Sequence, residues 1–258
     1  MSADDPIAAG DSRTVAQSAE PASAKPPAGR GRGRRAGTRS GEADTRDGIL
    51  DSAEALFAVH GFYGVTVRQI ATSANVDTAL VYYYFANKRE LFDRVFERRA
   101  DVLNRERLAS IDQYERDPGP GGATLEGVFN AFLRPVLDRA ATADPGWRAY
   151  FAIVAMVNNT PVWGGETMTR FFDPVIQRLL QSLRKLMPDA REDDLYWCYH
   201  FLSGALTLSL SVTGRIDRLS RGVCDSADFE AISARLGRFA AGGVAHVTGL
   251  SGAGDTKA

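Results

Sequence analysis

The side chains best suited to chemistry lie between Thr66 and Lys88, which read TVRQIATSANVDTALVYYYFANK. The stretch carries hydroxyl, phenol, guanidinium and ammonium groups, which hydrogen-bond to the phosphates and base edges of DNA. Its pattern is a short helix, a tight turn and a second short helix that begins with small residues and ends with three tyrosines. This is typical of a helix-turn-helix in the DNA major groove, so the sequence predicts a protein that binds operator DNA.

Local signals define the two helices and the turn. Thr66 and Gln69 have the spacing of a capping box, and apolar residues follow at helical spacing. Asn75 suits the turn because asparagine adopts a left-handed backbone more readily than most residues. Asp77 or Thr78 can cap the second helix. The alternative interpretation is an ordinary all-α core in which the tyrosines are half-buried packing residues.

Residues 45–92 resemble the DNA-binding domain of the TetR/AcrR family of bacterial transcriptional regulators. The sequence matches the family's usual form at Thr66, Ile70, Ala71, Ala74, Val76, Tyr82, Phe85, Lys88, Glu90 and Leu91. It departs at Asn75, where glycine is usual, and at Tyr84, where histidine is usual. The motif carries no information about the small molecule that such regulators sense.

A helix-turn-helix places the N-terminal residues of its second helix at the base edges. Thr78, Ala79 and Leu80 occupy these positions, where a hydroxyl can bond a base and a methyl can touch thymine. Arg68 is the candidate for a contact to guanine or for a phosphate clamp. The expected phosphate contacts are Thr66, Tyr82, Tyr83, Tyr84 and Lys88.

The composition gives a nearly neutral chain with one basic segment. The chain has 258 residues, 44% hydrophobic, and a formal net charge of −1, so binding to DNA depends on how its charge is distributed. Residues 1–43 are rich in alanine, glycine, proline and charge, which predicts a disordered tail. Its basic part contains Arg30, Arg32, Arg34, Arg35 and Arg39. This part is either a solubilising tail or an arm that grips phosphates beside the major-groove helix.

The chain reads as all-α, with a helix-turn-helix domain at 44–90, a helical ligand-binding and dimerisation domain at 91–250 and a disordered tail at 251–258. The helices predicted after the helix-turn-helix span 87–114, 125–140, 145–158, 166–187, 192–213 and 229–247. Proline is disfavoured inside helices, so we expect Pro135 to kink its helix and Pro174 to break its own.

The last two predicted helices have the character of a homodimer interface. An apolar stripe runs along the first of them, formed by Leu195, Tyr196, Tyr199, Leu202, Leu206 and Leu210. Two such helices from each subunit would form a four-helix bundle with two-fold symmetry, as the family resemblance also implies. A palindromic operator needs two recognition helices one DNA turn apart, which requires a dimer. The alternative is that both helices complete the core of the monomer.

Aromatic residues gather in the middle of the chain, where a helical bundle can hold a ligand. The expected pocket residues are Phe129, Trp147, Phe151, Asn158, Trp163 and Phe171. The alternative is that these aromatics are plain core. The expected effector is apolar or amphipathic, and a resemblance of the 195–206 segment to regulators of fatty-acid metabolism implies a fatty acid or acyl-CoA. An aromatic compound or a drug is the alternative effector. We expect the effector to release the DNA, which would make the protein a repressor, and the alternative is an activator that binds DNA with the help of its effector.

Other function classes find little support in the sequence. The three histidines, His60, His200 and His246, are far apart, and no metal motif, phosphate-binding loop or nucleophile elbow is present, so we expect no enzyme, cofactor or metal. No stretch is long and apolar enough to cross a membrane, and two cysteines without an N-terminal signal segment indicate a cytoplasmic protein. A helical module that binds protein instead of DNA is the remaining alternative.

Overall fold

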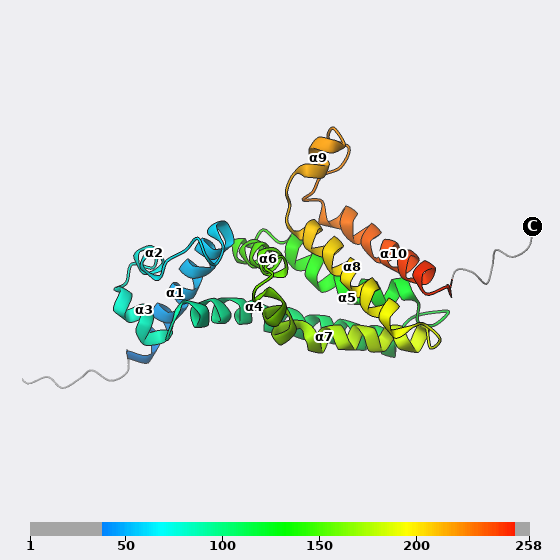
Figure 1. Cartoon of the computed structure of the whole chain (residues 1–258), viewed down its shortest axis with the longest axis horizontal. Coiled ribbons are helices and arrows are strands. Elements are labelled where there is room, and N and C mark those ends of the chain that lie inside the picture. The colour runs from blue at the N-terminus through cyan, green and yellow to red at the C-terminus, as the bar shows by residue number, and fades with distance from the viewer. Residues whose placement is uncertain (1–37, 251–258) are drawn as a thin grey trace, which may run out of the picture. The chain divides into compact units, whose positions relative to one another are not determined.

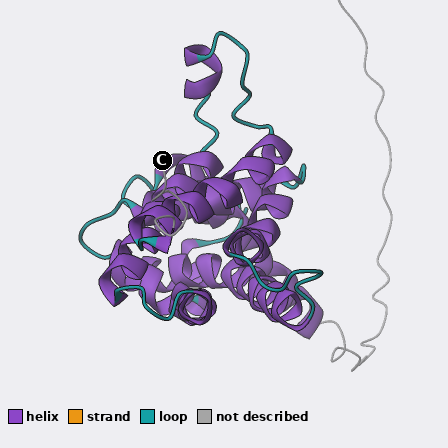
Figure 2. Cartoon of the chain, turned by 90° about the vertical axis from the view of Figure 1, so that its right-hand side faces the viewer, coloured by secondary structure: helices purple, strands orange, loops and turns teal. Residues whose placement is uncertain are grey.

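Helical spacing and N-terminal caps divide residues 38–250, which the computed structural model describes, into ten helices without a strand (Figure 2). The all-α fold class predicted from the sequence is confirmed. The first four helices are α1 (Thr38–His60), α2 (Val67–Ser73), α3 (Thr78–Tyr84) and α4 (Lys88–Arg116). The others are α5 (Leu125–Ala141), α6 (Pro145–Asn158), α7 (Gly164–Leu186), α8 (Glu192–Leu210), α9 (Arg215–Leu219) and α10 (Phe229–Val247).

Helix α1 begins at Thr38, so residues 38–43 belong to a helix and not to the predicted tail. Residues 41–44 are exposed. They extend the helix without adding to the core, which is why apolar spacing does not reveal them. The remainder of the predicted tail, with its arginines, and residues 251–258 lie outside the described residues.

Two prolines lie inside helices. Helix α7 runs through Pro174, where the sequence predicted a break, and α5 runs through Pro135. A proline removes one backbone hydrogen bond and strains the preceding turn. Packing offsets this cost in α7, because Phe172 and Val175 on either side of Pro174 are both buried. The short helix α9 had no counterpart in the sequence prediction.

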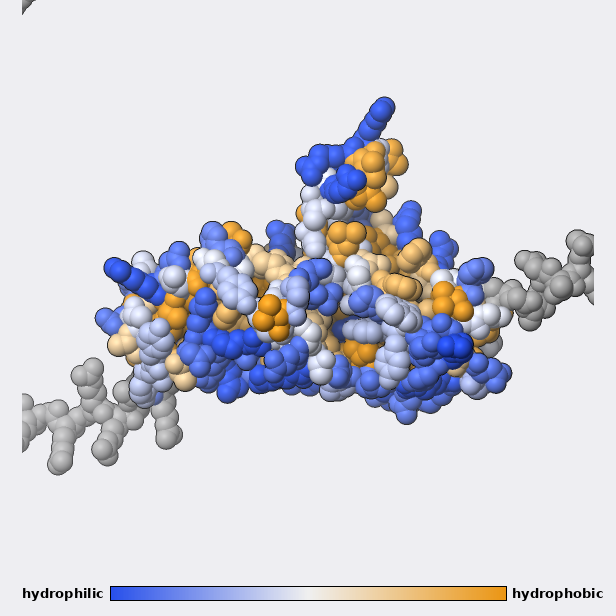
Figure 3. Space-filling model, viewed as in Figure 1, coloured by the Kyte–Doolittle hydropathy of each residue, from blue (hydrophilic) through white to orange (hydrophobic). Residues whose placement is uncertain are grey.

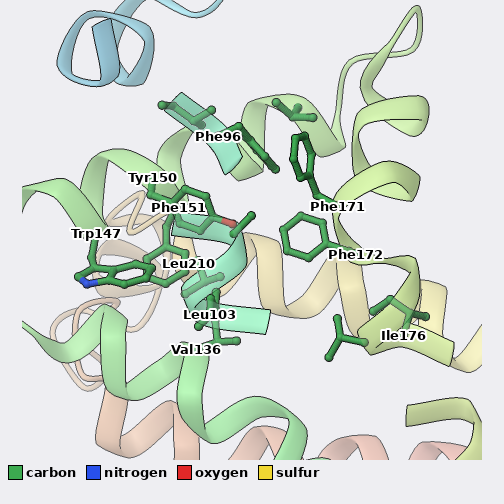
Figure 4. Close-up of a cluster of buried hydrophobic side chains, with 14 of the residues drawn as sticks. Phe96, Leu103, Val136, Trp147, Tyr150, Phe151, Phe171, Phe172, Ile176 and Leu210 are labelled. Carbon is green, nitrogen blue, oxygen red and sulfur yellow. The ribbon is translucent and has the colours of Figure 1, made fainter. Parts of the chain in front are cut away.

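The core of the C-terminal part forms where α5 packs against α4 and α10, and α7 packs against α4 (Figure 1). Aromatic rings from α4, α6 and α7 meet at its centre, and Phe96, Tyr150 and Phe172 are among them (Figure 4). Burying a ring of this size stabilises the fold by roughly 2–3 kcal/mol. Helix α4 reaches this core without a break from the helix-turn-helix, and residues 39–250 form one compact unit across the predicted boundary at residue 90.

Helix α8 presents to the core most of the stripe that the sequence assigned to a dimer interface. Leu195, Leu202 and Leu210 are buried, and Tyr199 and Leu206 are half-buried. These five residues therefore pack within the monomer, which does not support them as an interface, and Tyr196 is the one exposed residue of the stripe. The other large apolar side chains exposed on α8 are Trp197, Phe201 and Leu208.

A buried carboxylate joins α1 to α4. Glu54 is only 4% exposed, and its Oε1 accepts a hydrogen bond from Arg99 Nε at 2.8 Å. Its Oε2 accepts from Arg99 Nη2 at 3.0 Å and from Arg98 Nη2 at 3.1 Å. Two guanidinium groups thus compensate one buried negative charge and fix α1 against the start of the long helix.

Replacing Glu54 with alanine should lower the free energy of unfolding by about 3 kcal/mol, because two partly buried arginines would lose the buried carboxylate that they share. Chemical denaturation followed by circular dichroism measures this. Asp51→Ala is the matched control, since Asp51 also binds Arg98 but its side chain is 68% exposed. The control should change the free energy by less than about 1 kcal/mol. Equal losses in the two variants would contradict the role given to burial.

Candidate functional site

The capping box predicted at the start of α2 is present. Thr66 Oγ1 accepts a hydrogen bond from the Gln69 backbone N–H at 3.3 Å, and Gln69 Oε1 accepts from the Thr66 N–H at 2.8 Å. The Thr66 hydroxyl also donates to Gln69 Oε1 at 2.8 Å. The residue remains exposed. Its hydroxyl therefore orders the first turn of α2 while lying at the surface.

The turn between α2 and α3 depends on one left-handed residue. Asn75 has a φ of 54°, as its residue type predicted, and the next N–H, that of Val76, donates to the Ala71 carbonyl at 3.0 Å. Asp77 then caps α3 by accepting from the Ala79 N–H at 2.7 Å. Asparagine can replace the glycine usual at this turn because its side chain tolerates the left-handed region.

Helix α3 offers most of its surface to the outside. Val81 is its only buried residue. Ala79 is exposed, and Thr78 and Leu80 are half-buried, so all three predicted base-contacting residues are accessible at the N-terminal end of α3. A helix of seven residues with one buried side chain contributes little to the core.

The tyrosines at the end of α3 differ in exposure. Tyr82 is 52% exposed and Tyr83 is 74% exposed, which places both phenols at the surface. Tyr84 is half-buried, and its ring meets that of Tyr83 edge-on at 5.1 Å between centroids. Burial raises the pKa of Tyr84, and the carboxylate of Glu42 acts in the same direction, so its hydroxyl remains a donor at neutral pH. All three phenols are free to donate to phosphate.

Lys88 does not have the role that the sequence predicted. Its Nζ donates to the backbone carbonyls of Phe62 and Val65, each at 2.8 Å, and lies 4.4 Å from the centroid of the Phe62 ring. Burial lowers the pKa of its ammonium. The group that we expected to contact phosphate therefore holds the loop after α1 to the start of α4.

Arg68 is the cation that α2 leaves available. It is exposed, and its side chain forms no hydrogen bond or ion pair with any side chain or carbonyl described between residues 41 and 250. It lies near the start of α2. Its guanidinium can therefore bind guanine or phosphate without breaking an existing contact.

Two cavities lie in the helical part, and the predicted pocket residues divide between them. Cavity A, of about 50 Å³, is lined by residues of α4 to α8, and Phe151 belongs to its wall. Cavity B, of about 340 Å³, lies between the end of α1 and α6, and Trp163 belongs to its wall. Trp163 Nε1 donates there to the Tyr63 hydroxyl at 2.9 Å.

The other predicted pocket residues line neither cavity. Phe129, Trp147 and Phe171 are buried in the core, and Asn158 is exposed and donates to Thr207 Oγ1 at 3.1 Å. Their pocket assignment is not supported by the geometry, because aromatic spacing alone does not distinguish a cavity wall from solid packing. The sequence analysis overlooked Arg107, which lines cavity A. Its four-residue spacing from Leu103 and Ile111 was the available signal, since that spacing places it on the buried face of α4.

Between residues 41 and 250, no group of three or more acidic, histidine or cysteine side chains is arranged to hold a metal ion. No helix in the described range is long and apolar enough to cross a membrane.

Two family profiles match the chain, and together they span more than half of it. Residues 49–95 match the profile described as bacterial regulatory proteins, tetR family. Residues 130–243 match the profile described as tetracyclin repressor-like, C-terminal domain. The chain belongs to the TetR family. The first match covers the helix-turn-helix with the start of α4, and the second covers most of α5 to α10.

Curated relatives match a short part of the chain. The transcriptional repressor NicS of Pseudomonas putida is 43% identical over 65 residues, which is 25% of this chain and 31% of NicS. The negative transcriptional regulator IcaR of Staphylococcus aureus is 36% identical over 59 residues, 23% of this chain and 32% of IcaR. The chain thus matches about a third of the length of these relatives. Both are regulators of transcription, in keeping with the expectation that this chain is not an enzyme.

Solved structures share the fold over a longer range. The fatty acid degradation regulator FadR from Bacillus halodurans is 15% identical, with a TM-score of 0.55 over 77% of this chain and 95% of that one. A TetR-family regulator from Bordetella parapertussis is 17% identical, with a TM-score of 0.54 over 76% of this chain and 93% of that one. At these identities the likeness establishes the fold and nothing about the effector.

Loss of Lys88 and loss of Arg68 should have different effects on the stability of the protein. Lys88→Met should lower the free energy of unfolding by about 2 kcal/mol, because two carbonyls lose a charged donor. Arg68→Met should change the free energy of unfolding by less than about 0.5 kcal/mol, since its side chain forms no hydrogen bond or ion pair with the described residues. Thermal and chemical denaturation measure both changes.

The same two variants should differ on DNA in the opposite order. Arg68→Met should reduce the slope of log affinity against log salt by about 1, whereas Lys88→Met should leave the slope of the folded protein unchanged. Titration of a labelled duplex at several salt concentrations measures the slope. A reduced slope for Lys88→Met alone would restore its phosphate role.

Proposed function

We propose that this TetR-family protein is a transcriptional regulator that binds operator DNA as a homodimer and responds to a small effector. The observation that carries the proposal is α3, a capped helix in which only Val81 is buried and Ala79, Tyr82 and Tyr83 are exposed. A helix that contributes so little to the core is available to enter a major groove, into which an α-helix fits.

The exposed side chains of α2 and α3 can be assigned to contacts with DNA bases or with phosphates. Thr78 and Ala79 meet base edges, and Arg68 of the preceding helix contacts a guanine or a phosphate. Tyr82, Tyr83 and Tyr84 donate to phosphates and so set the register of the helix without reading sequence. Thr66 lies at the N-terminus of α2, where the exposed N–H groups of the first turn favour an anion.

Exposed apolar residues on the last helices support the homodimer. Phe201 and Leu208 of α8 are 60% and 68% exposed, and Phe239 of α10 is 72% exposed. Helix α9 stands away from the other helices and exposes Leu219 (Figures 1 and 2). Apolar surface also gathers on α9 and next to it (Figure 3). An exposed patch of this kind marks an interaction site, and a second copy of the chain is the occupant that a palindromic operator requires.

Helix α4 provides a route from effector to DNA. Its first residue, Lys88, binds carbonyls of the helix-turn-helix, and Leu103 and Arg107 further along line cavity A. An effector that shifts α4 changes the spacing of the two recognition helices in the dimer. A coupling free energy of roughly 1–3 kcal/mol would change operator affinity by 5- to 150-fold.

We favour an effector that lowers the affinity for DNA, which makes the protein a repressor. NicS is a repressor and IcaR a negative regulator, and they match this chain over 65 and 59 residues. An activator that binds DNA together with its effector would use the same DNA-binding surface, and α4 would again transmit the change. The effector is apolar or amphipathic, with fatty acids and acyl-CoA thioesters among the candidates.

Selection of duplexes from a random DNA pool at near-physiological salt tests the function. We expect enrichment of a palindrome whose half-sites lie about 10 base pairs apart, or a multiple of that spacing, centre to centre. Binding to it should weaken steeply with salt, whereas binding to a protein partner has no such slope. Tyr83→Phe should lower affinity for all sequences alike. Failure to enrich any sequence, with or without candidate effectors, would favour a protein-interaction module.

The homodimer predicts the effect of a charge on α8. Phe201→Glu should convert a dimer into a monomer, because it places a carboxylate within an apolar interface. Sedimentation velocity measures the mass, and circular dichroism verifies the fold. Val162→Glu is the control, because Val162 is 84% exposed and lies between α6 and α7. A wild-type monomer, or dissociation in both variants, would contradict the assignment.

A further inference from the structure

Cavity A contains a charge that the fold does not balance. Arg107 of α4 is only 5% exposed, and its Nε donates to the Phe132 carbonyl at 3.2 Å. Its guanidinium lies 3.7 Å from the centroid of the Phe132 ring. Among the described side chains, no carboxylate pairs with it, and no hydrogen bond engages its two terminal nitrogens. Most of its donors are therefore unused.

An unpaired buried cation is costly, and proteins keep one where it serves a purpose. Charged groups in the interior are normally paired, since removing a charge from water without a partner is strongly unfavourable. Other arginines of α4 follow that rule: both Arg98 and Arg99 bind Glu54. Burial lowers the pKa of Arg107 to about 10, so the guanidinium still carries its charge at neutral pH. Arg107 thus provides a positive charge without a counter-ion.

A second polar group in the cavity also has no partner. Tyr150 is fully buried, and its hydroxyl forms no hydrogen bond with the described residues. The phenol oxygen points into the cluster of side chains, toward Phe172 (Figure 4). Burial raises the pKa of Tyr150, while the charge of Arg107 acts in the opposite direction. The hydroxyl is therefore a neutral donor in the wall of the same cavity as Arg107.

The rest of the wall is mostly apolar, and the hydroxyls of Tyr199, Ser203 and Thr207 are its other polar side-chain groups. Its apolar part is formed by Leu103, Val136, Phe151, Phe172, Leu202 and Leu206, with others of the same kind. Arg107 is the only charged residue among the described residues that line the cavity. One positive charge is balanced by a monoanion, whereas a phosphate monoester with nearly two negative charges would leave a charge buried. A free volume of about 50 Å³ admits a small body and not a nucleotide-sized group.

From this arrangement we infer that cavity A binds a small monocarboxylate with an apolar body, with its carboxylate bonded to Arg107 and the Tyr150 hydroxyl. The inference rests on the proposed effector response for its biological meaning, and it narrows the effector class to a free carboxylate of modest size. The apolar chain or ring of the ligand lies against Phe151, Phe172 and the leucines of α8. Acyl-CoA thioesters do not fit this site.

Isothermal titration of the purified full-length protein tests the inference without DNA. The probes are propanoate and butanoate, compared with propanamide, butanamide and butyl phosphate. Each amide keeps the shape of its acid and lacks the charge. We expect each carboxylate to bind at least 10-fold more tightly than its amide, because bonds between charged groups are the strong ones. Equal affinity of acid and amide, no binding of either acid, or tighter binding of butyl phosphate would overturn the inference.

Variants identify the groups responsible. Arg107→Met should weaken carboxylate binding about 30-fold and leave amide binding unchanged, and its melting temperature should not fall, since it removes an uncompensated charge. Tyr150→Phe, which removes only a hydroxyl without a partner, should weaken carboxylate binding about fivefold. Arg105→Met is the control, because Arg105 is exposed on the same helix and the charge change is identical. Unchanged carboxylate affinity in both Arg107→Met and Tyr150→Phe would overturn the inference.

Carboxylate binding in cavity A and the effector response of the proposed function can be tested separately. Operator release is measured with the same carboxylates on the selected duplex. Carboxylate binding that depends on Arg107 but does not change operator affinity would support the site and contradict the effector response. Operator release by a compound that binds equally well to wild type and Arg107→Met would support the effector response and overturn the assignment of this cavity.

Discussion

The buried carboxylate of Glu54 is the contact on which the arrangement of the head depends. Its bonds to Arg98 and Arg99 hold α1 against α4, and Lys88 ties the loop after α1 to the first turn of the same helix. Helix α4 continues from there into the C-terminal core and so joins the helix-turn-helix domain to the rest of the fold. Without a firm contact between α1 and α4, movement of α4 would not be passed on to the helix-turn-helix.

Charged side chains in this protein divide into those that hold helices together and those that are free to bind other molecules. Glu115 of α4 accepts from Arg178, Lys185 and Ser182 of α7, so this carboxylate fastens two helices. Hydrogen bonding from Arg178 is the main reason that the pKa of Glu115 lies well below its ordinary value. Arg68 on the surface and Arg107 in the interior have no such partner. The free cations, and not the paired ones, mark the two proposed binding sites.

Features that depend on residues close together in sequence were predicted correctly, whereas features that depend on distant residues were not. The capping box at Thr66, the left-handed Asn75 and the Asp77 cap were read correctly, because each depends on residues within a few positions. Lys88 was misread, since its partners Phe62 and Val65 lie more than 20 positions away. Four of the six predicted pocket residues line neither cavity for the same reason, because only the packing of several helices shows which side chains border empty space.

The sequence by itself determined that the chain is helical, where the helix-turn-helix lies and which residues open its helices. These features follow from hydrogen bonds between near neighbours and from apolar spacing, both of which are written locally along the chain. Tertiary structure decided which face of α8 is buried, how α7 continues through Pro174 and that Arg107 has no counter-charge. Each of these depends on contacts between helices distant in sequence, whose packing energy outweighs local preference.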